Sequence, residues 1–369
     1  MTALKVLHVD SGREWRGGQR QVFLLAQGLR ERGHSPIVFA PPDSPLLEKS
    51  KSSGLLAESI VIRYDWDIRA SLLIREYVRQ SRVDIIHAHD ARSHAVARVS
   101  LIGLSHPPLV VTRRVPFAPK AARLKYGNRV TRFIAVSTAV KTAMVDAGIE
   151  PTRIVVVHSG VEQPPSNLQP RDWRTELSWP PDAVVCGVVG AMTPEKGVGE
   201  LEGIAASLSE TSRKQTRILL LGGAKRGRMT IAGVEAYSAG FVEDIIPAVA
   251  GLDVLWHPSR AEGLGTSVID AMAVGVPPVA FAVGGLSEVV VNHTSGLLVS
   301  PGNTTAFAEA AEQLICNPGL RASLGEQATG RAATFSAAKM TQQTEKVYYE
   351  LLSRSGNRSE PSILRGTSA

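Results

Sequence analysis

The sequence predicts an α/β protein made of two Rossmann-like, doubly wound parallel-sheet domains. Short apolar runs typical of buried parallel strands alternate with segments of helical periodicity. This alternation stops at a proline-rich stretch, 162–182, and restarts after it. The chain has 369 residues, 44% of them apolar, which is too long for one ordinary domain and enough to form two cores.

The first domain is expected over residues 1–163. Its strands are expected at 6–9, 36–40, 84–89, 109–112, 133–136 and 154–157. A helix is expected over 19–32, because its apolar residues form one stripe and Gly33 follows as a C-cap. Strands that alternate with helices form βαβ units, and such sheets bind ligands at the carboxyl ends of their strands.

A linker is expected over 164–183, and the second domain over 184–336. Its strands are expected at 184–189, 217–221, 253–257, 278–282 and 296–299, and its closing helices at 304–316 and 320–333. A C-terminal helix is expected over 337–355, with a crossing back to the first domain as one option. Residues 356–369 are polar and are expected to form a frayed tail.

The composition excludes several classes of protein. Cys186 and Cys316 stand far apart without a CxxC pair, which disfavours a disulfide scaffold and a cysteine zinc site and favours a reducing compartment. No secretory signal and no apolar run long enough for a membrane span are visible. Residues 1–165 hold 24 Lys and Arg against 14 Asp and Glu, whereas 166–369 hold 17 against 20, so the first half is expected to meet an anionic partner.

The most informative stretch is 259–290, SRAEGLGTSVIDAMAVGVPPVAFAVGGLSEVV. Glu262 stands in a tight loop with Gly263 and Gly265, and a helix is expected to begin near Thr266. The free N–H groups of that helix can receive a phosphate, while Glu262 and Asp270 can accept sugar hydroxyls. The alternative is a surface acid at Glu262 and a solvated helix residue at Asp270.

This stretch resembles the nucleotide-sugar motif of retaining glycosyltransferases of family 4, which have the GT-B fold with two domains facing a cleft. The matching residues are Glu262, Gly263, Gly265, Ala271, Met272, Ala273, Gly275, Pro277, Gly284 and Gly285. The resemblance implies that Glu262 contacts the donor hexose and that the residue eight positions later contacts the ribose. That residue is Asp270 here instead of the family's Glu, with roughly 1.5 Å less reach.

Residues 189–198 resemble the family's loop that grips the donor diphosphate. Lys196 matches its lysine, whereas Ala191 stands where the family has an arginine. The arginines considered as replacements are Arg16, Arg226, Arg228 and Arg260. No DxD triad stands in a suitable loop, so no metal is expected. Lys196 and the backbone N–H groups of Leu264, Gly265 and Thr266 are therefore expected to meet the diphosphate charge.

Three further segments resemble parts of the family's site. Phe241 and Val242 match the loop whose backbone holds the nucleobase, with core packing as the alternative for Phe241. Gly17 and Gly18 match a Gly-Gly pair that approaches the donor phosphate, with an ordinary turn as the alternative. His89 matches a histidine that faces the donor sugar. His87 shares its strand face and His94 lies on the next helix, and a buried structural histidine is the alternative for each.

Basic residues mark the acceptor side of the first domain. Arg16 and Arg20 flank the Gly-Gly pair and are expected near an anionic acceptor. The stretch 113–132 contains seven cations and no acid: Arg113, Arg114, Lys120, Arg123, Lys125, Arg129 and Arg132. It is expected to contact an anionic membrane or glycolipid, with a solvated basic face as the alternative. Nucleic acid is disfavoured, because no recognisable binding module accompanies the charges.

The resemblance predicts an enzyme, a retaining hexosyltransferase that uses a nucleotide sugar as co-substrate, without a cofactor. A UDP-sugar is weakly favoured over a GDP-sugar. The acceptor is expected to be a glycan or glycolipid of the cell envelope, such as lipopolysaccharide, and the location the cytoplasm or the cytoplasmic face of the membrane. The alternatives are a non-catalytic nucleotide-sugar-binding protein, suggested by Ala191 and Asp270, and a sugar-nucleotide 2-epimerase. A Rossmann oxidoreductase is disfavoured, because no GxGxxG follows the first strand.

Overall fold

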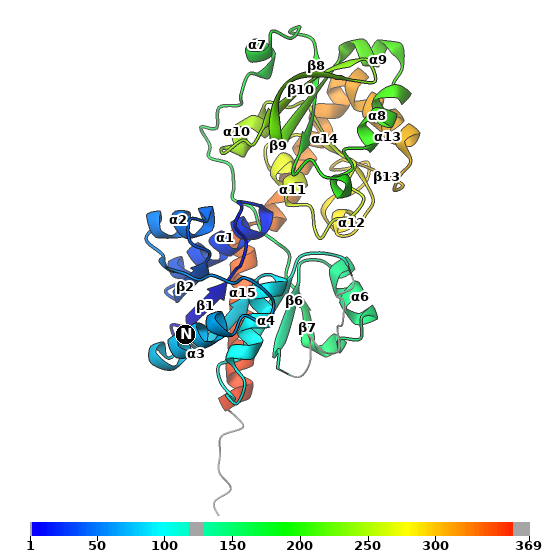
Figure 1. The fold of residues 1–369 in the computed structure, drawn as a ribbon. Helices are drawn as coiled ribbons and strands as arrows, with labels where there is room; N and C mark the ends of the chain where they lie inside the picture. Colours follow the sequence, from blue (N-terminus) through cyan, green and yellow to red (C-terminus); the bar gives the residue numbers. More distant parts are fainter. Residues whose placement is uncertain (1, 118–128, 357–369) are drawn as a thin grey trace, which may run out of the picture.

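The computed structural model describes residues 2–117 and 129–356, and it contains two sheets in two stacked bodies (Figure 1). The first sheet has seven parallel strands in the order β3-β2-β1-β4-β5-β6-β7. These are β1 (Lys5–Val9), β2 (Ser35–Ala40), β3 (Leu56–Ser59), β4 (Ile85–Ala88), β5 (Leu109–Arg113), β6 (Arg132–Ala135) and β7 (Ile154–Val156). Its helices are α1 (Gly17–Glu31), α2 (Pro45–Ser52), α3 (Ile68–Ser81), α4 (Ala91–Ser100) and α6 (Thr138–Asp146), with a 3-10 turn at Pro151–Arg153.

The second sheet has six strands in the order β10-β9-β8-β11-β12-β13. These are β8 (Val184–Val189), β9 (Thr216–Ile231), β10 (Val234–Gly240), β11 (Val254–His257), β12 (Pro278–Phe281) and β13 (Leu297–Val299). Its helices are α8 (Glu200–Ser207), α9 (Glu210–Gln215), α10 (Ile245–Ala250), α11 (Thr266–Ala273), α12 (Leu286–Val289), α13 (Thr304–Cys316) and α14 (Pro318–Ala332), with 3-10 turns at Pro194–Lys196 and Ala333–Phe335. The prediction of two doubly wound α/β domains is therefore confirmed.

Three strands, β3, β9 and β10, differ from the sequence-based expectation. β9 continues ten residues beyond Leu221 and forms an antiparallel hairpin with β10, which was not expected. The hairpin turns at Ala232 and Gly233, whose φ angles of 45° and 81° suit a tight β-turn. The outer half of this hairpin is largely exposed and lacks an apolar pattern. The short edge strand β3 is also mostly exposed, so the sequence of neither segment showed the apolar run of a buried strand.

The proline-rich connection carries a short helix, α7 (Trp173–Leu177), which packs on the second domain. The indole of Trp173 is fully enclosed, and its Nε1 donates to the carbonyl of Ala248 at 2.8 Å. Trp179 likewise donates to Glu235 on β10 at 2.9 Å. The connection is thus fastened to one domain by its two tryptophans.

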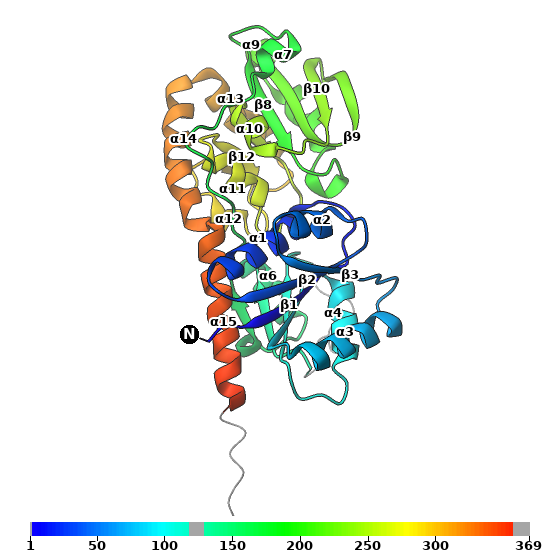
Figure 2. The same cartoon turned by 90° about the vertical axis from the view of Figure 1, so that its left-hand side faces the viewer.

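The last helix, α15 (Ala337–Gly356), runs from the second body down along the first, as Figures 1 and 2 show in orange and red. Its buried residues Met340, Val347, Tyr348 and Leu351 share a core cluster with Leu4, Val6, Leu24 and Leu25 of the first domain. The chain therefore crosses between the domains twice, and the two crossings meet where Val161 bridges to Ser336.

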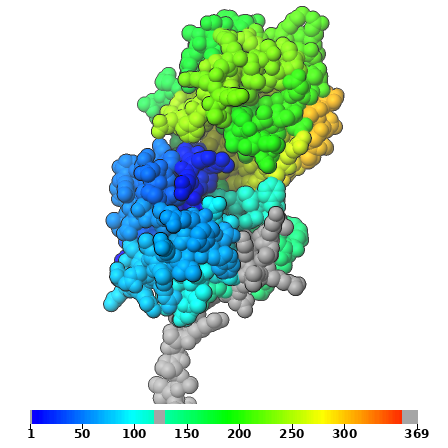
Figure 3. Space-filling view, viewed as in Figure 1, coloured from blue at the N-terminus to red at the C-terminus, as the bar shows by residue number. Residues whose placement is uncertain are grey.

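The loops at the carboxyl ends of the two sheets face each other where the bodies meet. In the space-filling view the green-to-orange second body rests on the blue and cyan first body (Figure 3). Within the described residues, no helix has the length and apolar composition needed to cross a bilayer.

Candidate functional site

The glycines of the 259–290 motif are required by close backbone packing. A Cβ atom on Gly284 would lie less than 3.0 Å from the carbonyl oxygen of Glu262, which is closer than Cβ atoms approach in real structures. Gly284 also has a φ of +54°, which favours glycine. A Cβ on Gly263 would collide in the same way with the carbonyl oxygen of Arg114 in the first domain. Glycine at these positions lets the Glu262 loop pack between the turn at Gly284 and Gly285 on one side and Arg114 of the first domain on the other.

Two helix N-termini face each other across the domain boundary. α1 begins at Gly17 and α11 at Thr266, and a Cβ on Gly17 would lie 3.2 Å from the hydroxyl of Thr266. Neither helix has an acidic residue in its first turn, and neither N-cap residue, Arg16 or Gly265, caps it with a side chain. Both ends can therefore offer N–H groups to one anion, such as a diphosphate.

Glu262 lies beside these helix ends in a charged cluster. Its Oε1 accepts hydrogen bonds from the Lys196 ammonium and, at 2.8 Å, from His257 Nε2. Glu262 is only 7% exposed. Burial raises its pKa, but the hydrogen bond and charge of His257 and the Lys196 ammonium outweigh burial and lower the pKa to about 2. Glu262 is therefore an ionised acceptor at neutral pH, suited to hydroxyl groups and not to proton donation.

Asp270 forms an ion pair that joins the two domains. Arg20 Nη1, from the first turns of α1, lies 2.6 Å from Asp270 Oδ2. Asp270 is buried, and within the described part of the chain its Oδ1 has no hydrogen-bond partner. Burial raises the pKa of Asp270, whereas the Arg20 charge and hydrogen bond oppose that rise. The Arg20 guanidinium also lies 3.4 Å from Glu162, and its expected place beside an acceptor stays a prediction.

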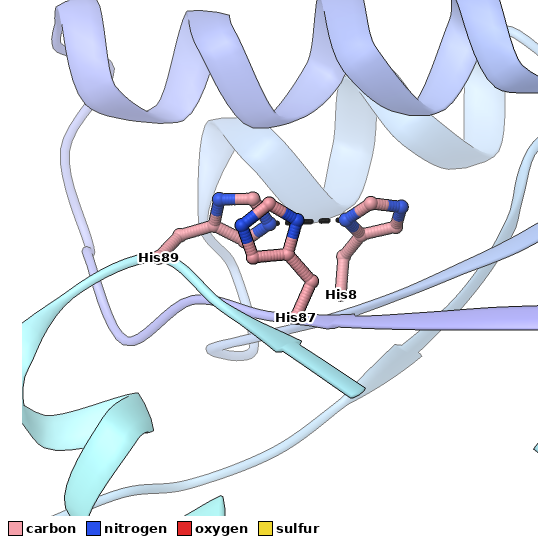
Figure 4. Close-up of side chains that lie close together, drawn as sticks. All are labelled: His8, His87 and His89. Carbon is pink, nitrogen blue, oxygen red and sulfur yellow. Dashed lines mark hydrogen bonds between the residues drawn. The ribbon is translucent and has the colours of Figure 1, made fainter. Parts of the chain in front are cut away.

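The His89 side chain is turned inward and does not face the opposite domain. Arg114 Nη2 lies 3.1 Å from His89 Nδ1, and His89 Nε2 lies 3.0 Å from His8 Nδ1 (Figure 4). Because a guanidinium only donates, Nδ1 of His89 accepts, and Nε2 carries the proton that it donates to His8. With both nitrogens engaged and 4% exposure, the His89 ring cannot contact a sugar in this structure, contrary to the prediction.

His8 was overlooked in the sequence, although the strand pattern contained a signal. It is the parallel-register partner of His87 and therefore points to the same face as His87 and His89. Nitrogen atoms of the three rings lie within 4.8 Å of one another, a spacing that could suit a metal. However, Arg114 occupies the only lone pair of His89, and both His87 nitrogens bond hydroxyls, those of Tyr348 and Thr112, each at 2.6 Å. The cluster is thus a hydrogen-bonded network that ties α15 to the sheet.

The arginines proposed to replace the one absent at Ala191 are engaged elsewhere or exposed. Arg16 pairs with Glu14, Arg228 with Glu235 and Arg260 with Glu200, and Arg226 lies on the exposed part of the hairpin. The arginines that the structure brings to the Gly17–Gly18 turn are instead Arg20 and Arg114, the latter with its Cδ 3.9 Å from a Cβ built on Gly18.

The predicted nucleobase loop lies at the end of β10. The Phe241 ring is 65% exposed, so core packing of this side chain is wrong, while Val242 is partly buried against the core. The exposed ring leaves the loop open to a ligand, and the role of its backbone in binding a base stays a prediction.

Part of the basic stretch is used inside the first domain. Arg129 and Arg132 donate to the carbonyls of Leu104 and Thr152, and Arg114 to that of His89. Arg113 donates to the Phe117 carbonyl at 2.8 Å. The interpretation of these four as free surface cations is therefore corrected: they lie at the ends of β5 and β6, where the fold uses them. Lys120, Arg123 and Lys125 lie outside the described residues.

Comparison with known families assigns both halves of the chain. Residues 15–163 match the family model "Glycosyltransferase Family 4", and residues 170–331 match "Glycosyl transferases group 1". A D-inositol 3-phosphate glycosyltransferase of Actinosynnema mirum is 31% identical over 220 residues, covering 54% of this chain and 52% of that one. A GDP-mannose-dependent alpha-mannosyltransferase of Mycobacterium tuberculosis is 26% identical over 312 residues, covering 78% and 80%. The chain spans about half the length of the first curated relatives that it matches.

Comparison with solved structures supports the architecture. The complex of Anabaena HepE with UDP-glucose superposes with a TM-score of 0.80 at 22% identity, covering 95% of this chain and all of the other. At this identity the likeness concerns the fold, which is the same two-domain arrangement.

Proposed function

Since the chain belongs to glycosyltransferase family 4 and has the GT-B fold, we propose that it transfers a hexose from a nucleoside diphosphate sugar to a hydroxyl group, with retention of configuration. The observation that carries the proposal is the convergence of two uncapped helix N-termini beside the Glu262–Lys196 pair. This places anion-binding N–H groups, an ammonium and a hydroxyl acceptor together, as a nucleotide sugar requires.

The proposed roles follow from charge and position. The N–H groups at Gly17, Gly18 and Leu264–Thr266 hold the diphosphate, and Lys196 neutralises the charge that develops on it as the sugar–oxygen bond breaks. Glu262 accepts hydroxyls of the hexose, Asp270 accepts those of the ribose, and backbone atoms near Phe241 and Val242 hold the base. The acceptor hydroxyl attacks from the face that the diphosphate leaves, and the diphosphate takes its proton, so no protein nucleophile is needed. Closure of the two domains excludes water.

The donor nucleotide is proposed to be UDP, with GDP second. Each choice has support from one similar protein: HepE was solved with UDP-glucose, and the mycobacterial relative is GDP-mannose-dependent. The acceptor is proposed to be an anionic glycan or glycolipid of the cell envelope, because the cationic first half lies opposite the donor motif. Contact with an anionic membrane at the cytoplasmic face would depend on Lys120, Arg123 and Lys125, since the described cations of that stretch are engaged in the fold.

The test is a donor screen followed by product analysis. Purified protein is heated with UDP-, GDP- and ADP-sugars, and a donor at 100 times its Kd should add about 2.7 kcal/mol of stability. The stabilising donor is then incubated with and without candidate acceptors. Transfer with a retained anomeric centre supports the proposal, whereas an epimerised nucleotide product from donor alone indicates a 2-epimerase. Binding without any turnover favours a non-catalytic protein, the second candidate, which Ala191 at the family's arginine position motivates.

A further inference from the structure

The two carboxylate oxygens of Asp270 have different surroundings. Oδ2 accepts a hydrogen bond from Arg20, while Oδ1 is buried and has no partner among the described residues. Asp270 as a whole is 6% exposed. A buried ionised oxygen without a donor is costly, so most such oxygens are paired in native proteins. The free Oδ1 therefore indicates a hydrogen-bond donor that comes from a bound molecule.

The group that holds Asp270 in place belongs to the opposite domain. Arg20 lies one turn after Gly17, the residue that faces Thr266 at the start of α11. Its guanidinium reaches Asp270 at 2.6 Å and Glu162, on the segment that leaves the first domain, at 3.4 Å. These are the charged groups that act on Asp270: Arg20 from α1 lowers its pKa, and Glu162 raises it, as burial does. Among the described residues, Arg20 is thus the cation that opposes the protonation of this buried acid.

The pair also gives a physical account of the aspartate in the motif. The guanidinium of Arg20 fills the space directly beyond the Asp270 carboxylate, at hydrogen-bond distance. An additional methylene at this position would push the carboxylate into that guanidinium. The shorter side chain of Asp270 therefore leaves room for the guanidinium of Arg20. The sequence alone indicated only that an aspartate reaches less far than a glutamate.

We propose that Arg20 is a positioning residue of the donor site, which pairs with Oδ2 of Asp270 and thereby directs its Oδ1 to a ribose hydroxyl of the nucleotide. The inference rests on the proposed function, since it names the group that orients one of its donor contacts. Because Arg20 and Asp270 lie on different domains, this contact is complete only when the two domains are closed.

A second contact between the domains supplies a matched control. Glu288 of α12 accepts hydrogen bonds from the backbone N and hydroxyl of Thr138, at 2.8 and 3.0 Å, and lies 3.0 Å from His158. It thereby caps helix α6 of the first domain without touching Asp270. Glu288→Gln should weaken a contact between the two domains without changing the surroundings of Asp270. Arg20→Gln should weaken such a contact and also remove the counterion of Asp270.

The experiment measures nucleotide affinity by calorimetry on the full chain, with UDP and GDP and their 2′-deoxy and 3′-deoxy analogues. In the wild type, loss of the recognised hydroxyl should weaken binding about tenfold, which is typical of a hydrogen bond to a charged group. Arg20→Gln should weaken UDP or GDP binding by a similar factor and then show little further loss with the deoxy analogue. Arg20→Lys should recover part of the loss, and Glu288→Gln should keep the full sensitivity to the hydroxyl.

The pH profile separates positioning from a general structural effect. Burial raises the pKa of Asp270 and Arg20 opposes that rise, so removal of Arg20 should raise this pKa further. The affinity of Arg20→Gln for the nucleotide should therefore fall at a higher pH than that of the wild type as the solution is acidified. An Arg20→Gln protein that folds, keeps the wild-type sensitivity to the missing hydroxyl and has the wild-type pH profile overturns the inference while the proposed function stands. A wild type that binds neither UDP nor GDP overturns both.

Discussion

Replacement of Glu262 by glutamine should remove a charge that stabilises the fold chiefly at neutral pH. Burial raises the pKa of Glu262, but His257 and Lys196 hold it at about 2 in the folded protein, against 4.5 for the unperturbed group. A folded-state pKa below the unfolded one stabilises the protein fully above the unfolded pKa, and this contribution is lost as the pH falls through the folded pKa. The interval between 4.5 and about 2 corresponds to about 3 kcal/mol at neutral pH. By the same linkage, the ionised Glu262 still contributes about 1.4 kcal/mol to the free energy of unfolding at pH 3.

The assay is urea unfolding of the wild type and Glu262→Gln at pH 7, 5 and 3, followed by circular dichroism. The amide keeps the shape of the side chain, so the comparison isolates the charge. The variant should be less stable by up to about 3 kcal/mol at pH 7, with a difference that narrows by roughly half at pH 3. Glu326→Gln on the exposed face of α14 serves as the control. The difference in unfolding free energy between this variant and the wild type should be the same at pH 7, 5 and 3. A Glu262→Gln difference that is the same at pH 7 and pH 3 would refute the assignment of an ionised, paired Glu262.

Three further outcomes are expected. Lys196→Ala should lower turnover by about 10²–10³ while the fold persists, because one cation on the leaving diphosphate is lost, whereas the exposed Lys214→Ala should keep wild-type rates; equal rates in both variants would contradict the role of Lys196. Gly284→Ala should destabilise the protein by at least about 2 kcal/mol, since its φ is positive and its Cβ meets the Glu262 carbonyl, while Gly330→Ala in α14 meets nothing and should be neutral or stabilising; thermal unfolding compares the two. Replacement of Lys120, Arg123 and Lys125 by Gln should reduce co-sedimentation with anionic vesicles at low salt, where screening is weak, without changing nucleotide affinity; equal wild-type binding to neutral vesicles argues for a solvated face.

The donor half of the site could be predicted from sequence because its residues are close together in the chain. The glycines at 263, 265, 284 and 285 are fixed by local turns and close backbone approaches, which leave a recognisable spacing. Glu262 precedes α11 by a few residues, so the sequence also predicted its place beside that helix N-terminus. Lys196 required the resemblance, because a single lysine before a turn carries little information of its own.

The roles of the arginines and histidines could not be read from spacing. Arg20 is 250 residues from Asp270, and Arg114 contacts His89 across two different strands, so their partners depend on how the sheet and the domains assemble. The sequence placed His89 on the right strand, but the guanidinium beside it decided which way its nitrogens are used. The partners of Arg113, Arg114, Arg129 and Arg132 were missed for a similar reason, because charge alone does not distinguish a surface group from one that bonds a backbone carbonyl.

The sequence by itself determined the two α/β domains, the connection between them and the glycine-rich loops, since apolar periodicity, proline and glycine act over a few residues. Only the tertiary structure decided that α15 returns to the first sheet, that two helix N-termini face each other and that Arg20 holds Asp270. Those contacts join residues far apart in the chain, and their stability comes from burial and charge pairing that arise only once both domains have folded and closed on each other.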